Sequence, residues 1–213
     1  MSDETRLREK ICRMAQSLFD RGLTCGSSGN ISARTADGGL LVTPTGSTMG
    51  DLDPARLSLF DADGRFVSGD KPTKEMPLHE AFYRTRGTTG AVVHLHSTHS
   101  VAYSMLPDVD PDDVLPPLTA YSVMRLGRVK LLPYFMPGDP AMGAAVAELG
   151  GTRPAVILAN HGPVVAGKDL DAAVFATEEL EETAKLAMLL RRESPRMLTA
   201  DQVRALRERY PLD

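Results

Sequence analysis

The sequence predicts an α/β protein in which a mainly antiparallel sheet is covered by helices. Two pairs of short strand-like segments come before residue 70, and each pair flanks a Gly-containing turn, as in β-hairpins. Beyond that point, helical and strand-like segments alternate. Early hairpins followed by alternation are typical of an antiparallel sheet with helices packed on it. The length of 213 residues fits a single domain covering 1–213.

The first half of the chain is expected to open with an amphipathic helix and to continue into the hairpins. Leu7, Ile11, Met14 and Leu18 recur at helical spacing, and Gly22 suits the end of that helix. The strands expected from their composition are Ile31–Arg34, Leu40–Thr43, Leu57–Phe60 and Arg65–Ser68.

The middle of the chain contains a helix, a strand and an irregular stretch. A helix is expected from Pro77 to about Arg86, because proline suits the first helical turn. Ala91–His96 reads as a short strand, and Ser97 or Thr98 can cap a helix after it. The segment 108–117 is rich in Asp and Pro and is expected to be irregular.

The last third alternates strands with helices. We expect strands at Val129–Leu132 and Ala155–Ala159 with a helix between them. A long helix should run from Asp169 or Asp171 to about Arg192, and Thr199 should cap a final helix ending near Arg209.

Composition excludes several classes of protein. The net charge of −4 gives no broad basic surface for nucleic acid. Cys12 and Cys25 are too few for a disulfide framework, and the polar N-terminus lacks the apolar core of a signal peptide. Apolar runs such as Pro154–Ala159 are too short to span a bilayer. We therefore expect a cytoplasmic protein that binds neither nucleic acid nor membrane.

Three of the five histidines cluster in residues 94–99. On a strand, His94 and His96 would project from one face with Leu95 on the other, so both imidazoles could bind one ion. Two polar residues on an open sheet face would give the same pattern. His99, three residues after His96, is expected to turn away from an ion and to be structural, and His79 to serve packing or orientation.

A third histidine and a glutamate could complete a site. His161 follows the apolar run 154–159, at a strand end where binding residues collect, although a loop histidine bonded to its own turn fits equally. Glu75 could ligate a metal or act as a general base, or could simply favour a helix N-terminus.

Two loops of small residues are suited to bind an anion. Residues 26–30 and 43–47 offer hydroxyls and free amides, which are the donors that a phosphate needs. Neither loop matches a nucleotide-binding fingerprint, and each could be no more than a tight turn.

Five motifs, taken together, resemble the class II aldolase/adducin family over about residues 5 to 192. They are Gly-Asn-Ile-Ser-Ala-Arg (29–34), Val-Thr-Pro-Thr-Gly (42–46), Lys-Pro-Thr-Lys-Glu (71–75), Val-Val-His-Leu-His (92–96) and Asn-His-Gly (160–162). The resemblance implies an α/β/α sandwich with a central, mainly antiparallel sheet. It also implies a C4 homotetramer whose active sites lie between subunits.

The resemblance further implies roles for single residues. His94, His96 and His161 match the zinc ligands, and Glu75 matches a catalytic acid/base that also approaches the metal when substrate is absent. The positions that match phosphate-binding residues are Gly29, Asn30, Thr45, Gly46, Thr73 and Lys74. Tyr121 lies in a region from which the family often supplies a second acid to a neighbouring subunit.

Residues 159–170 and 176–185 are most similar to the 3-oxo-tetronate 4-phosphate decarboxylase branch of this family. That branch implies loss of CO2 from a phosphorylated four-carbon sugar acid, giving dihydroxyacetone phosphate through a metal-stabilised enediolate. Lys74 departs from the L-fuculose-1-phosphate aldolase pattern, which has serine there. Three imidazoles suit Zn2+, and also Co2+, Mn2+ and other divalent ions.

Three alternatives stay open at this stage. A ketose-1-phosphate aldolase forms the same enediolate, so the metal ligands alone do not separate it from a decarboxylase. A sugar-phosphate epimerase shares the fold. A binding module like the adducin head domain is a non-enzymatic alternative, but such modules lack the metal-binding histidines that this sequence has.

Overall fold

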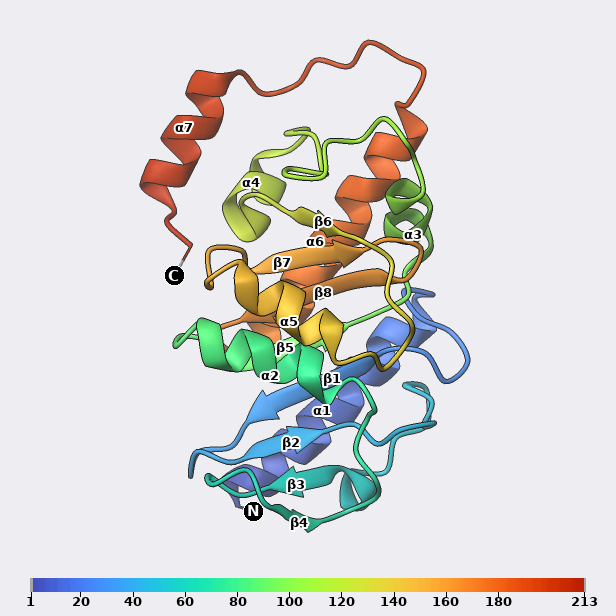
Figure 1. Ribbon diagram of the computed structural model, residues 1–213, viewed down its shortest axis with the longest axis vertical. Coiled ribbons are helices and arrows are strands. Elements are labelled where there is room, and N and C mark those ends of the chain that lie inside the picture. Colours follow the sequence, from blue (N-terminus) through green and yellow to red (C-terminus); the bar gives the residue numbers. More distant parts are fainter. Residues whose placement is uncertain (1, 213) are drawn as a thin grey trace.

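The computed structural model describes residues 2–212 and contains one eight-stranded sheet with helices on both faces (Figure 1). The strands are β1 (Asn30–Arg34), β2 (Leu40–Val42), β3 (Ser58–Phe60), β4 (Phe66–Ser68), β5 (Ala91–His94), β6 (Lys130–Leu132), β7 (Ala155–Leu158) and β8 (Gly162–Gly167). Their order across the sheet is β4-β3-β2-β1-β5-β8-β7-β6. The pairing of β6 with β7 is parallel and the other pairings are antiparallel, which confirms the predicted fold class.

The helices form two layers. They are α1 (Asp3–Asp20), α2 (Met76–Thr85), α3 (Thr98–Ser104), α4 (Ala120–Leu126), α5 (Ala141–Glu148), α6 (Leu170–Leu189) and α7 (Ala200–Arg209), with a short 3-10 helix η1 (Pro54–Arg56). In Figure 1, α2 and α5 lie in front of the sheet, whereas α1 and α6 lie behind it. None of these helices combines the length and apolarity that crossing a bilayer requires.

Alternating side chains of the central strands supply both cores. Val92 of β5 packs with α2 and α5, whereas its neighbour Val93 packs with α1 and α6. Val164 and Val165 of β8 divide in the same way between the front and rear layers. Because successive residues of a strand face opposite sides, a strand buried on both faces must be apolar at every position. These central strands therefore hold fixed the end of the sheet at which the candidate site lies.

Most predicted elements are present, with ends that differ by a few residues. Asp169 caps α6, and Thr199 begins α7 with a capping box. The prediction for Ala91–His96 needs correction, since β5 ends at His94 and His96 lies in the segment before α3. Three elements were not predicted: β8, α4 and the short helix η1.

The strand is shorter because its pairing on both sides ends at His94. β5 pairs with β1 and β8 through His94, opposite Asn30 and Val164. Beyond that point the chain turns into α3, whose N-cap residue Ser97 uses its hydroxyl on the carbonyl of Leu23 rather than on the helix. His96 is thus placed by the start of a helix and not by the ladder.

Close contact between α2 and α5 gives a stability prediction. A Cβ on Gly143 of α5 would lie 2.4 Å from the carbonyl oxygen of Pro77, at the start of α2. Gly143→Ala should lower the free energy of unfolding by about 1–3 kcal/mol, as overpacking does, although alanine is intrinsically the better helix former. Urea unfolding of this variant measures the loss.

The matched control is Gly87→Ala, because a Cβ at Gly87 would meet nothing within 4 Å. Equal unfolding midpoints for the two variants would contradict the close packing of α2 against α5.

Candidate metal centre

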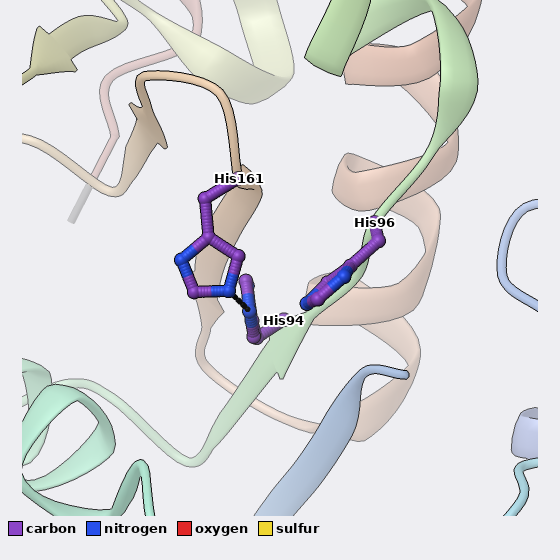
Figure 2. A group of neighbouring side chains, drawn as sticks. All are labelled: His94, His96 and His161. Carbon is purple, nitrogen blue, oxygen red and sulfur yellow. Dashed lines mark hydrogen bonds between the residues drawn. The ribbon is translucent and has the colours of Figure 1, made fainter. Parts of the chain in front are cut away.

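The three predicted histidines meet at one end of the central strands. His94 is the last residue of β5, His96 follows two positions later, and His161 lies in the turn between β7 and β8. One ring nitrogen from each lies within 4.8 Å of the others. Figure 2 shows the three imidazoles facing a common point, with ring centroids 4.7–5.0 Å apart. The structure therefore brings together, in the shape of a metal site, residues 67 positions apart in sequence.

The hydrogen bonds of His94 fix which nitrogen faces the centre. Its Nδ1 lies 2.9 Å from the carbonyl oxygen of Pro163, and a carbonyl can only accept, so Nδ1 carries the proton. The lone pair is then on Nε2, which points inward and lies 3.4 Å from Nε2 of His161. Two ligands at ~2.0–2.1 Å from a tetrahedral ion are separated by about 3.3 Å. The observed spacing fits a shared divalent ion.

Nδ1 of His161 is the ring nitrogen that does not face the other histidines. Among the described residues it is the buried side-chain polar atom that has no hydrogen-bond partner. Leaving such a group unsatisfied costs about 1–3 kcal/mol. The imidazole is held in this position by the β7–β8 turn, where Asn160 adopts a positive φ of 57°. The turn thus holds the ring with Nε2 toward the other two histidines.

The carboxylate of Glu75 lies close to the same point. Its Oε2 lies 3.5 Å from Nε2 of His94 and its Oε1 lies 3.4 Å from Nε2 of His161. Glu75 is the N-cap residue of α2, yet its side chain makes no capping hydrogen bond. The helix-terminus interpretation therefore does not account for this carboxylate, whereas proximity to a metal or a reacting group does.

The electrostatics keep the carboxylate charged and the rings neutral. Burial opposes the charge on Glu75, but attraction to His94 or His161 whenever one of them is protonated, and the hydrogen bond from the Asn30 amide, hold the pKa of Glu75 below its ordinary value. Burial lowers the pKa of His94 to about 4, against the opposing pull of Glu75. Burial also lowers the pKa values of His96 and His161. Neutral imidazoles are the form that binds metal.

One of the two predicted anion loops, residues 43–47, lies beside the segment 71–75 that ends at Glu75. The amide of Thr45 donates to the carbonyl of Lys71, and Pro44 forms an isolated β-bridge with Pro72. Gly46 has a positive φ of 73° and nothing within 4 Å of a hypothetical Cβ, so a ligand could approach its backbone closely. The loop therefore has an exposed backbone at one of the positions predicted to bind phosphate.

The other residues predicted to bind phosphate have different surroundings in the structure. Lys74 is exposed and lies near enough to lower the pKa values of His96 and His161, so its charge reaches the centre. Gly29 is needed for packing, because a Cβ there would lie 2.9 Å from the carbonyl oxygen of His94. The hydroxyl of Thr73 accepts hydrogen bonds from the Asn30 side chain and from the backbone of Glu75.

Two predicted residues lie outside the cluster. His99 donates its backbone amide to Glu181 of α6, and its Nδ1 lies 2.8 Å from the same carboxylate, so it faces away from the other histidines. Tyr121 on α4 is exposed and lies beneath the guanidinium of Arg125. Its predicted place in a neighbouring subunit's site stays a prediction.

Sequence reasoning missed a buried polar row behind Glu75. Ser32 is hydrogen-bonded to both His79 and Tyr83, and His79 is also hydrogen-bonded to Asn30. The alternation of β1 and the i, i+4 spacing of His79 and Tyr83 could have suggested that these residues share a face.

The comparisons identify the family. The model of the Class II Aldolase and Adducin N-terminal domain matches residues 9–188. The chain belongs to the class II aldolase/adducin family. It is 51% identical to the 3-oxo-tetronate 4-phosphate decarboxylase of Escherichia coli (strain K12) over 96% of each chain. It is 36% identical to the L-fuculose phosphate aldolase of Methanococcus maripaludis (strain DSM 14266), over 85% of this chain and 94% of that protein.

A solved structure of this class II aldolase family agrees closely with the fold. The crystal structure of YgbL from Escherichia coli superposes with a TM-score of 0.94 at 50% identity, covering 97% of this chain and all of that one. The order of strands and helices described above is therefore that of the family.

Loss of one ring should abolish metal binding. We expect purified His94→Ala to hold no stoichiometric divalent ion, because a site with two histidines lacks the third fixed ligand. Metal analysis after loading with Zn2+ or Co2+ measures this. His99→Ala is the matched control and should retain one ion per chain; a full complement of metal in His94→Ala would contradict the site.

The lowered pKa values predict weak proton competition for the metal. Three histidines with the ordinary pKa of 6.5 would lose roughly 30-fold in affinity between pH 7 and pH 6. Here His94, with a pKa of about 4, stays neutral throughout, and the pKa values of His96 and His161 are also lowered, so we expect a loss of less than about tenfold. Calorimetric titration with Co2+ at the two pH values measures it, and a 30-fold loss would contradict the electrostatic assignment.

Proposed function

We propose that this protein is a metal-dependent 3-oxo-tetronate 4-phosphate decarboxylase that yields dihydroxyacetone phosphate and CO2. The observation that carries the proposal is full-length similarity, at about half identity, to proteins of that activity. The convergence of three neutral imidazoles and one carboxylate supports it, because this is the arrangement that the chemistry requires.

The reaction breaks the bond between C1 and C2 of a 3-oxo acid. The electron pair of that bond stays on the sugar as CO2 leaves, which produces an enediolate over C2 and C3. A divalent ion, when bound, supplies Lewis-acid stabilisation of the developing negative charge. His94, His96 and His161 would hold it, and neutral ligands leave its full charge available. Zn2+ is our proposal for the ion, with Co2+ or Mn2+ as replacements.

Glu75 completes the reaction in this proposal. Protonation of C2 converts the enediolate into dihydroxyacetone phosphate and consumes one proton. The carboxylate of Glu75 lies 3.4–3.5 Å from the inward nitrogens of His94 and His161, so it is placed to take a proton from solvent and pass it to C2. In the absence of substrate the same carboxylate is placed to approach the ion as a ligand.

In this proposal the phosphate group of the substrate sets its orientation in the site. We assign the phosphate to Gly29, Thr45, Gly46 and Thr73, of which Gly46 offers the most open backbone. The side chain of Asn30, also predicted to bind phosphate, is occupied by Glu75. Lys74 is a cation beside the centre, suited to the phosphate or to the carboxylate that departs as CO2.

A complete site in this proposal needs a second chain. We propose a C4 homotetramer, in which Tyr121 of one subunit supplies an acid to the site of its neighbour. The exposure of Tyr121 leaves it available for such a contact. Each chain contributes one domain, residues 1–213.

The second candidate is a ketose-1-phosphate aldolase. Identity of 36% to an L-fuculose phosphate aldolase favours this alternative over unrelated chemistry. An aldolase breaks a bond to an aldehyde carbon and forms the same enediolate, so the metal centre serves both reactions equally.

Product analysis separates the two functions. Zinc-loaded protein given 3-oxo-tetronate 4-phosphates should release one CO2 for each dihydroxyacetone phosphate formed, measured by coupled assays. Metal-loaded protein that releases no CO2 but cleaves a ketose 1-phosphate would replace the decarboxylase with the aldolase. Interconversion of isomers without loss of carbon would indicate an epimerase.

A single substitution tests the role of Glu75. Glu75→Gln should retain the metal but lower kcat by about 10²–10⁴-fold, because the amide has no proton to give carbon. Steady-state kinetics with metal analysis on the same sample measures both properties. Glu80→Gln, at an exposed position of the same helix α2, should keep wild-type turnover; full activity in Glu75→Gln would remove Glu75 from the mechanism.

A further inference from the structure

A row of buried polar side chains leads from the contact between α2 and β1 to Glu75. The hydroxyl of Tyr83 lies 2.9 Å from Oγ of Ser32, which lies 2.7 Å from Nδ1 of His79. Nε2 of His79 lies 2.5 Å from Oδ1 of Asn30, whose Nδ2 lies 2.7 Å from Oε2 of Glu75. His79 and Ser32 are fully buried, so these bonds have no competition from bulk water.

The chemistry of the groups fixes the direction of each bond. A carboxylate only accepts, so the Asn30 amide must present its nitrogen to Glu75 and its oxygen to His79. An amide oxygen also only accepts, so Nε2 of His79 carries a proton. Burial, aided by His94 and opposed by Glu75, lowers the pKa of His79 to about 3, so the ring is neutral and has one N–H.

The rest of the row follows from that single proton. Nδ1 of His79 carries a lone pair and accepts from the hydroxyl of Ser32, and Ser32 in turn accepts from Tyr83. The donor and the acceptor of each hydrogen bond between Tyr83 and Glu75 are thus assigned.

Asn30 has no side-chain donor left for a ligand. One N–H of its amide goes to Glu75, and the nitrogen also lies 3.2 Å from Oγ1 of Thr73. Thr73 also accepts from the backbone amide of Glu75. In this structure the side chain of Asn30 holds the carboxylate and does not present an amide to a phosphate.

We propose that His79 is a positioning residue, which as its Nε2–H tautomer locks the amide of Asn30 in the one orientation that donates to Glu75. Without the N–H of His79, the amide can rotate by half a turn. Its oxygen would then face the carboxylate oxygen of Glu75, and repulsion would move Glu75 away from the metal centre. The inference rests on the proposed role of Glu75 in proton transfer.

Three substitutions separate positioning from mere packing. His79→Phe keeps the ring volume and removes both nitrogens, whereas His79→Gln keeps an N–H near the place of Nε2. We expect His79→Phe to lower kcat by about 10–100-fold, the usual effect of losing a residue that orients a ligand or its partner. KM and metal content should stay within about twofold, and His79→Gln should recover most of the turnover.

Thr177→Val is the matched control for loss of a buried polar bond. Thr177 is fully buried on α6, and its hydroxyl bonds only within that helix, to the carbonyl of Ala173. This variant should lower the unfolding midpoint and leave kcat unchanged. Positioning is overturned if His79→Phe retains full kcat, or if His79→Gln is no more active than His79→Phe at equal metal content.

A measurement without substrate keeps this inference separate from the proposed function. Proton–nitrogen correlation spectra of resting, 15N-histidine-labelled protein distinguish the two tautomers of His79. The expected spectrum shows a proton on Nε2 and a lone pair on Nδ1, and Ser32→Ala should reduce that preference. A proton on Nδ1 overturns the inference even if the enzyme decarboxylates, whereas absent CO2 release with an Nε2 proton overturns only the decarboxylase.

Discussion

The constraint on which the structure depends is a charged carboxylate buried against three neutral imidazoles. Burial alone would discharge Glu75, so the surrounding elements must compensate. The amide of Asn30 donates to the carboxylate, and a divalent ion held by His94, His96 and His161 would place positive charge beside it. Each of these groups is held by a different part of the sheet. The site therefore exists only when the pairing of β1, β5 and β8 is complete.

The sandwich provides this pairing because its central strands are apolar on both faces. Asn30 and His94 lie opposite each other at the ends of β1 and β5, and the β7–β8 turn brings His161 to the same edge. A one-residue slip in register would send these side chains to the other face. The two helix layers, by fixing Val92 and Val93 to opposite sides, prevent that slip. The packing of Val92 and Val93 in the two cores thus sets the positions of the side chains at the metal centre.

The sequence predicted most elements and the three ligands, and it failed where tertiary contacts decide. The helical spacing of apolar residues in α1 and the capping residues Asp169 and Thr199 are local signals, so these helices were predictable. β8 was not, because its Gly and Pro residues weaken every strand pattern and its pairing partners are distant in sequence. The row of polar side chains through His79 was not predicted for the same reason. His79 lies on α2, whereas Ser32 and Asn30 lie on β1, which is distant in sequence. Family motifs supplied the roles of Glu75 and the loops, which spacing alone left open.

The central claim is that His94, His96 and His161 hold one divalent ion with coordination positions left for substrate. X-ray absorption at the metal edge of zinc-loaded protein tests it most directly, since imidazole rings give a distinctive scattering pattern. The account predicts three nitrogen neighbours from imidazole at ~2.0–2.1 Å, together with oxygen ligands that change when substrate or an analogue is added. Fewer than three imidazoles, or a closed coordination sphere that substrate does not alter, would contradict the account.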